Sequence, residues 1–192
     1  INFRKHNKVN GRLITGDTLY LIVESDHIWE ESSEPSNFYR LIKYDLLTKR
    51  KSVYEFPFDK SARQSTYKNL ITNVDGEINI FLNVDKEKDL RFNGRVSKHY
   101  IFVNDQFVLQ DVHKNRFFSK YLPEEQILVG YTFDEVGDQD ELLDRRYIYN
   151  YLNSADIAFF TFKANIIKLH HELELPKAQD FKGIIKMGDN YL

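Results

Sequence analysis

Short apolar runs separated by turn-forming residues recur along the whole chain. The runs are four to seven residues long and rich in Val, Ile, Leu, Phe and Tyr, at 19–23, 38–44, 52–56, 78–84, 100–103 and 157–162. This length and composition are typical of β-strands, whereas helices need longer stretches with apolar residues three or four apart. The dipeptides Gly16-Asp17, Asp75-Gly76 and Asn104-Asp105 stand beside such runs, where they favour tight turns. The pattern therefore predicts an all-β chain built from antiparallel hairpins.

The order of strands and turns repeats about three times along the chain. Each repeat reads strand, turn, strand, polar loop, strand, turn, strand, and the repeats span 10–59, 67–114 and 123–176. The final residues, IIKMGDNYL, resemble the first hairpin, RLITGDTLYL, so the start of a fourth repeat is expected at 183–192. We therefore expect residues 1–192 to form a single β domain that is a fragment of a longer chain.

The repeat resembles the blade of a β-propeller, which is a four-stranded antiparallel sheet. The resemblance is carried by GDTLYL as an inner strand and by YRLIKYDLLT as the outer pair. The sequence has neither the Gly-His and Trp-Asp signature of WD40 blades nor the double glycine of kelch blades. Because propellers typically have four or more blades, the resemblance implies consecutive blades of an incomplete propeller. The residues alone leave two alternatives open, a self-contained β-sandwich or open barrel and a mixed α+β fold.

Three polar stretches interrupt the strands. Those at 25–37 and 85–98 are predicted to be loops, the second with a turn at Asn93-Gly94. The third, at 134–156, is the longest, and its part from 139 to 152 has no Gly or Pro and places its apolar residues near helical spacing. We therefore expect a short inserted helix near 139–152.

Composition narrows the classes of partner. The chain has 27 basic and 29 acidic side chains, a net charge of -2, which gives no field strong enough to indicate a nucleic-acid partner. It has no apolar run long enough to form a membrane-spanning helix. It also has no cysteine, which excludes disulfides and thiolate metal sites. Both an exported protein with its signal removed and a cytoplasmic protein stay open.

The acidic stretch at 134–144 is the densest group of hard oxygen ligands in the sequence. Its carboxylates are of the kind that Ca²⁺ prefers, and the candidate ligands are Asp134, Asp138, Asp140 and Asp144. Their spacing does not match the ligand pattern of an EF-hand loop. In the alternative interpretation, Asp138 and Asp140 cap the N-terminus of the predicted helix in a solvated loop. Apart from this calcium site, the sequence predicts no cofactor.

A second candidate site combines residues of the first two polar stretches. His27 and Trp29 belong to the first stretch, and Arg91 and Phe92 belong to the second. Loops on one face of a propeller surround a central funnel, so the resemblance implies that these side chains come together there. Aromatic rings on such a face stack on sugars or anchor protein partners.

No sequence motif identifies a catalytic centre. The chain has no Gly-x-Ser-x-Gly, no glycine-rich phosphate loop ending in Gly-Lys, and no His-Glu-x-x-His. His99 and His113 flank a predicted hairpin and are interpreted as ordinary surface histidines. His170 and His171 are adjacent in a predicted strand, so they point to opposite faces and cannot bind one ion together.

These observations predict a non-catalytic binding or protein-interaction module of the β-propeller type, with a protein or a carbohydrate as its ligand. The alternative is part of a propeller-type hydrolase or lyase whose active site brings together His27, the loop of Arg91 and the acidic stretch. A third class is a structural domain that packs against further blades or another chain. An exposed aromatic patch around Trp29 would indicate a module. A histidine and a carboxylate within hydrogen-bond reach in a concave pocket would indicate an enzyme.

Overall fold

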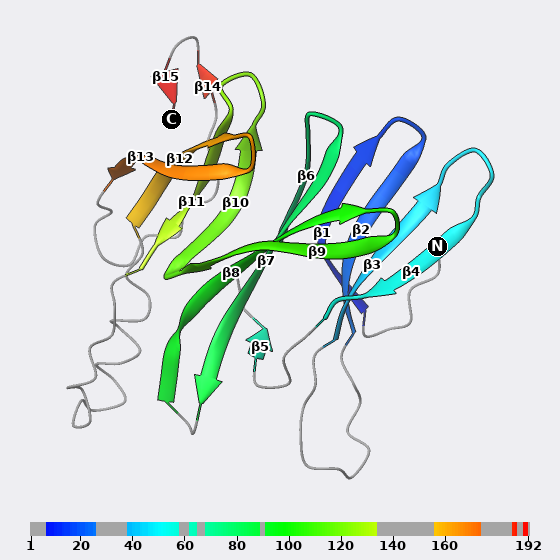
Figure 1. Ribbon diagram of the computed structural model, residues 1–192, viewed down its shortest axis with the longest axis horizontal. Coiled ribbons are helices and arrows are strands. Elements are labelled where there is room, and N and C mark those ends of the chain that lie inside the picture. Colours follow the sequence, from blue (N-terminus) through cyan, green and yellow to red (C-terminus); the bar gives the residue numbers. More distant parts are fainter. Residues whose placement is uncertain are drawn as a thin grey trace.

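The computed structural model describes residues 7–25, 38–57, 62–64, 68–88, 91–133, 156–173, 186–187 and 190–191 (Figure 1). Every regular element in these residues is a β-strand, so the predicted all-β class is confirmed. Within the same residues, no helix has the length and apolar character needed to cross a membrane. The helix expected near 139–152 lies outside the described residues.

Most strands belong to three antiparallel sheets in which, apart from β5, consecutive strands pair with each other. Sheet A runs β1 (Asn7–Thr15), β2 (Thr18–Ser25), β3 (Phe38–Asp45) and β4 (Lys51–Glu55). In sheet B, β5 (Ala62–Gln64) and β6 (Leu70–Val74) both pair with β7 (Glu77–Lys88), which is followed by β8 (Arg91–Val103) and β9 (Gln106–Lys114). Sheet C runs β10 (Arg116–Leu122), β11 (Ile127–Thr132), β12 (Asp156–Lys163) and β13 (Ile166–Leu173). A separate hairpin joins β14 (Lys186–Met187) to β15 (Asn190–Tyr191).

Backbone turns with positive φ close the hairpins that the sequence predicts. Gly16 has a φ of 53°, and Asp75 and Gly76 have φ values of 51° and 89°. Asn104 and Asp105, at 50° and 60°, form the turn between β8 and β9. Gly, Asn and Asp adopt these angles more readily than other residues, and two such angles in succession match the twist of a two-residue hairpin. All three predicted turns are confirmed.

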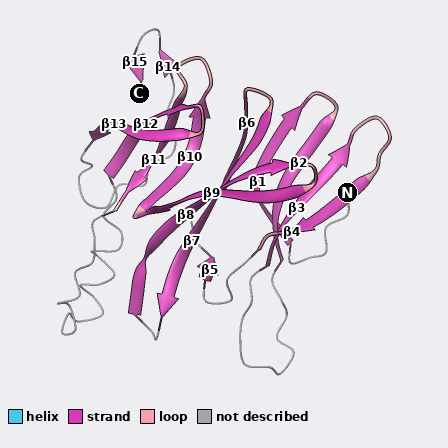
Figure 2. Cartoon of the chain, viewed as in Figure 1, coloured by secondary structure: helices cyan, strands magenta, loops and turns pink. Residues whose placement is uncertain are grey.

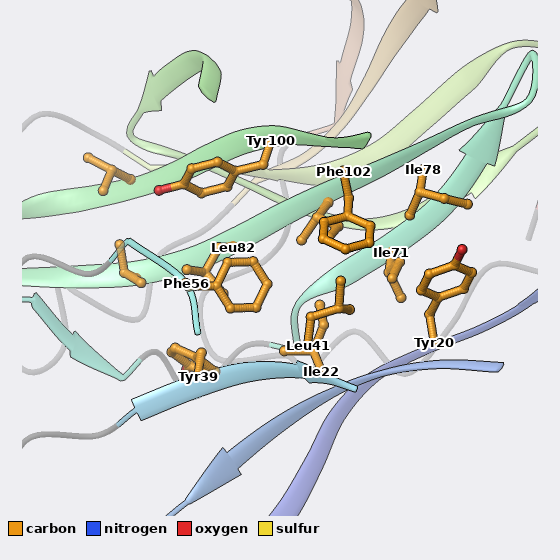
Figure 3. Close-up of a cluster of buried hydrophobic side chains, with 13 residues drawn as sticks. Tyr20, Ile22, Tyr39, Leu41, Phe56, Ile71, Ile78, Leu82, Tyr100 and Phe102 are labelled. Carbon is orange, nitrogen blue, oxygen red and sulfur yellow. The ribbon is translucent and has the colours of Figure 1, made fainter. Parts of the chain in front are cut away.

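Sheet B lies between sheets A and C and is covered on both faces. A large apolar cluster fills the space between sheets A and B, as Figure 3 shows, with Tyr20, Ile22, Tyr39 and Leu41 opposite Ile78, Leu82, Tyr100 and Phe102. Between sheets B and C, an aromatic cluster brings Phe81 of β7 against Phe118 of β10 and Phe162 of β12. Because side chains alternate between the two faces of a strand, each central strand of sheet B contributes to both layers.

The three sheets are stacked with their tight hairpin turns at the same end. The ends that carry the tight turns are joined by side-chain hydrogen bonds, from Asn73 to Thr15, from Lys43 to Asp105 and from Asn165 to Glu77. These bonds link sheet A to sheet B twice and sheet C to sheet B once. In Figure 2 the turns inside the hairpins lie toward the upper half of the view, on the side away from the ends where β7 stops and β8 starts.

Sheets A and B approach each other most closely where β6 lies beside β1. On the other face of sheet B, β10 of sheet C crosses β6, β7 and β8. The Asn69 backbone N–H donates to the Asn10 carbonyl oxygen across the two sheets at 3.2 Å. A Cβ atom at Gly11 would lie 3.0 Å from the Asn69 carbonyl oxygen, so a larger residue there would require the neighbouring atoms to shift by a few tenths of an ångström. The fourth strands β4 and β9 carry mostly exposed side chains and form the opposite, outer side of each sheet.

Two local features differ from the sequence-based expectations. The loop predicted at 85–98 and its turn at Asn93-Gly94 are wrong, because β7 extends to Lys88 and β8 begins at Arg91, which pairs with Lys88. The third repeat is predicted to begin at residue 123, but the first strand of sheet C, β10, precedes that position in the sequence. Sheet C therefore has four strands, like sheet A.

Candidate functional site

The residues predicted to form a site belong to, or adjoin, the connections between strands at the end of the stack opposite the tight turns. β2, β7 and β11 end there, and β3, β8 and β12 begin there. His27 and Trp29 belong to the segment that connects β2 to β3, and residues 134–155 connect β11 to β12. Because the three sheets share one direction, these three connections start from the same end of the molecule.

The side chains predicted to form a site lie outside the part of the chain that the structure describes. His27 and Trp29 lie outside it, as do Asp134, Asp138, Asp140 and Asp144. Arg91 and Phe92 are the first residues of β8, where the backbone is described and the side chains are not. The funnel site and the calcium site therefore stay predictions. Among the residues that the structure does describe, no three His, Asp or Glu side chains gather as metal ligands would.

A buried polar network links the three sheets, and it begins at the long-connection end of sheet A. Glu24, the residue before the end of β2, is 2% exposed and accepts a hydrogen bond from the Asn10 amide at 3.5 Å. Asn10 Oδ1 in turn accepts from the Asn69 backbone N–H at 3.0 Å, and Asn69 Oδ1 accepts from the Asn83 backbone N–H at 2.7 Å. Buried polar groups are retained where they are hydrogen-bonded, so this chain of contacts fixes sheet B against sheet A in one register.

Asn83 extends the network into sheet C. Its side chain, 1% exposed, accepts a hydrogen bond from the Phe118 backbone N–H at 3.3 Å and donates to the Phe118 carbonyl oxygen at 2.9 Å. The same amide group also donates to the Lys68 carbonyl oxygen at 2.7 Å. Phe118 lies where β10 shifts register against β11, so the side chain of Asn83 bonds both backbone groups of a residue at an irregularity of the strand.

Two histidines that the sequence analysis interpreted as surface residues are buried between sheets B and C, which corrects that interpretation. His99 on β8 is fully buried and His113 on β9 is 8% exposed. His99 Nε2 lies 2.7 Å from Asn79 Oδ1, and the ring stacks on Phe81 with centroids 4.4 Å apart. Burial lowers the pKa of His99 to about 4, and burial also lowers the pKa of His113. Both rings are therefore neutral at physiological pH.

Among the described residues, no hydrogen bond joins the histidine pair to a nucleophilic side chain. Ser97 Oγ, two residues before His99 on the same strand face, has no hydrogen-bond partner among the described atoms, and neither have His99 Nδ1 and His113 Nε2. A nucleophile activated by a base requires a hydrogen bond between the two, and no such bond joins Ser97 to either ring in the described part. By contrast, His170 and His171 on β13 are both exposed.

Comparison with known proteins adds no family to this picture. No model of a known protein family matches the chain, and no curated protein matches its sequence. The argument for a function therefore depends on the arrangement of the sheets and of the segments that connect them.

Proposed function

We propose that the three sheets are consecutive blades of a β-propeller and that the chain is a non-catalytic binding or protein-interaction module. The observation that carries the proposal is the common direction of three antiparallel sheets stacked face to face, each with a run of four consecutive strands, and with β6 of sheet B beside β1 of sheet A. In a propeller the first strands surround the axis and the blades fan outward from it. The ligand-binding surface is then the end from which the connections of β2, β7 and β11 leave.

The hairpin of β14 and β15 supports the same architecture. Met187 pairs with Asn190 around Gly188-Asp189, as Thr15 pairs with Thr18 around Gly16-Asp17. In the proposal this hairpin is the start of a fourth blade, and further blades or another chain complete the ring. The intact mass of the native protein tests this part. A native chain much longer than 192 residues is expected, whereas a folded native monomer of 192 residues would contradict the incomplete propeller.

The ligand surface is tested through Trp29, the single tryptophan of the chain. Its fluorescence therefore reports on the connection of β2 to β3 alone, and a panel of soluble cello-, chito- and xylo-oligosaccharides is the probe for a carbohydrate ligand. For a protein ligand, the probe is affinity capture with the wild type, Trp29→Ala and Leu47→Ala in parallel. Leu47 is 73% exposed at the turn between β3 and β4, so it is a matched control at the opposite end of sheet A.

The expected result is one ligand, a sugar or a single protein, that Trp29→Ala loses and Leu47→Ala keeps. A ligand lost with Leu47→Ala and kept with Trp29→Ala would place the surface at the wrong end of the stack. The hydrolase or lyase alternative uses the same end of the stack, since His27 and the acidic segment 134–144 belong to the connections there and Arg91 is the first residue of β8. Turnover of a bound oligosaccharide or peptide that His27→Gln abolishes would favour the enzyme over the module.

A further inference from the structure

The contact between sheets B and C contains the rings of two histidines as part of its aromatic packing. His99 stacks on Phe81 and meets Phe162 of β12 edge-on, with centroids 5.6 Å apart. His113 meets Phe118 of β10 edge-on, with centroids 5.1 Å apart, and lies 6.4 Å from His99 between ring centroids. Each histidine of sheet B therefore touches a phenylalanine of sheet C, so the two rings form part of the surface that joins the sheets.

The hydrogen bonds around His99 fix which ring nitrogen holds the proton. The Asn79 amide group donates to the Glu77 carbonyl oxygen at 3.2 Å, so the amide oxygen Oδ1 faces the ring. Because an amide oxygen only accepts, the proton of neutral His99 is on Nε2, and Nδ1 presents a lone pair. That Nδ1 is buried and has no partner among the described atoms. A second proton on the ring would therefore form an N–H group that has no acceptor there.

His113 is in a similar state, with one charged group on each side. Its Nδ1 lies 3.6 Å from the carboxylate of Asp111 on β9, a side chain that is 65% exposed, while its Nε2 is buried without a described partner. Arg116 of β10 disfavours the protonated ring, and Asp111 favours it. Asp111 and Arg116, together with the two histidines themselves, are the titratable or charged groups of the described strands that act on this pair.

We propose that the junction of sheets B and C is an acid-sensitive switch, in which protonation of His99 and His113 releases sheet C from sheet B. Charge on either ring has to be hydrated, and water reaches the buried nitrogens only when the two sheets separate. In this proposal sheet A stays on sheet B, because His99 and His113 lie on the face of sheet B that meets sheet C, whereas the described cluster between sheets A and B contains Tyr, Phe, Ile, Leu and Val. The switch therefore separates one sheet and leaves the other two together.

Amide hydrogen exchange of the full 192-residue chain at pH 7 and pH 5, corrected for the intrinsic rate at each pH, tests the proposal. With a pKa of about 4 for His99 in the closed state and an ordinary value near 6.5 in the open state, the opening constant rises about twentyfold between these pH values from His99 alone. We expect this rise in β10, β11 and β12, and little change in β1, β2 and β3. Equal loss of protection in all three sheets, or none in β10 to β12, would overturn the proposal.

Three variants separate the switch from a merely structural role of the rings. His99→Gln and His113→Gln each remove a titrating group, so each is expected to flatten the dependence of the β10–β12 opening on pH, whatever it does to stability at pH 7. His171→Gln changes an exposed histidine of β13 and is the matched control, with the wild-type dependence retained. If a variant does not fold, imidazole NMR titration of the wild type decides the matter. Two rings that titrate normally near pH 6.5 without loss of sheet C would contradict the switch.

Discussion

The side chain of Asn83 offers the sharpest test of how the sheets are joined. Substitution to Ala removes one hydrogen bond from the Phe118 N–H and two bonds to the carbonyl oxygens of Phe118 and Lys68. The backbone of β7 is unaffected, because the bond that Asn69 accepts comes from the Asn83 main chain. The change therefore removes the hydrogen bonds of Asn83 between sheets B and C and leaves the hydrogen-bonded link between sheets A and B.

The magnitude follows from what the substitution leaves unpaired. Each buried donor or acceptor without a partner costs about 1–3 kcal/mol. Both backbone groups of Phe118 are buried, whereas the bond to Lys68 is only partly buried, and water can replace it at lower cost. We expect Asn83→Ala to lower the free energy of unfolding by about 3–5 kcal/mol. That is a large share of the roughly 5–15 kcal/mol of a typical domain.

Urea unfolding at pH 7.5, followed by circular dichroism, measures this loss. Gln106→Ala, an exposed amide at the start of β9, is the control and is expected to change the free energy by less than about 0.5 kcal/mol. Asn83→Asp adds a second arm, because a carboxylate can accept from the Phe118 N–H but repels the two carbonyl oxygens. It should be at least as unstable as Asn83→Ala at pH 7.5 and recover when acid protonates it. A loss below about 1 kcal/mol for Asn83→Ala would refute the reasoning.

Three further predictions concern packing and surface charge. A Cβ atom at Gly130 would collide with the Phe117 carbonyl on the paired strand, so Gly130→Ala should cost about 3 kcal/mol or more in thermal or urea unfolding. Phe56 is 5% exposed and stacks on Phe107 with ring centroids 4.2 Å apart, so Phe56→Ala should lower the free energy of unfolding by about 3–5 kcal/mol in the same assay. Lys43 and Asp105 form an ion pair at 3.0 Å, and their side chains are 38% and 55% exposed. Lys43→Met should therefore change the free energy of unfolding by less than about 1 kcal/mol, and 0.5 M salt should reduce the difference between variant and wild type. A difference that does not depend on salt would contradict this prediction.

The strands and their turns could be predicted from the sequence because their signals are local. Val, Ile, Phe and Tyr favour strands, and Asp75-Gly76 or Asn104-Asp105 favour a turn whatever surrounds them. The same local reasoning was wrong at Asn93-Gly94, where partners far along the chain decide the outcome: Val84 pairs with Val96, and the hairpin continues beyond that pair. A turn dipeptide raises the preference for a turn, but it does not exclude a strand whose neighbour is long enough to pair with it.

The burial of His99 and of its neighbours could not be predicted by alternation. In β8, Ser97 and His99 alternate with Val96 and Tyr100, a pattern typical of a strand with one face in water. Sheet B is covered on both faces, so its polar face is buried against sheet C. The signal that was available is chemical: Asn79 on β7 and His99 on the adjoining strand β8 can hydrogen-bond to each other, which makes the burial of both side chains tolerable. The predicted site residues on the long connections remain predictions for a different reason, since their side chains lie outside the described part of the chain.

The two junctions of sheet B differ in kind, and that difference decides which one acid opens. The junction with sheet A combines an apolar cluster, which includes no histidine among its described residues, with the hydrogen bonds that join the buried Glu24 to Asn10 and Asn10 to Asn69. The junction with sheet C depends on the neutral form of His99, whose pKa of about 4 lies well below that of an exposed histidine. The open state binds the proton first as the pH falls below about 6.5, so the free energy that favours the closed junction falls by about 3 kcal/mol by pH 4 and by slightly more below it, where His99 becomes protonated in the closed state too. This loss is comparable to the lower end of the range expected for the Asn83 link, and in the proposed switch it weakens the junction with sheet C in acid while sheets A and B remain together.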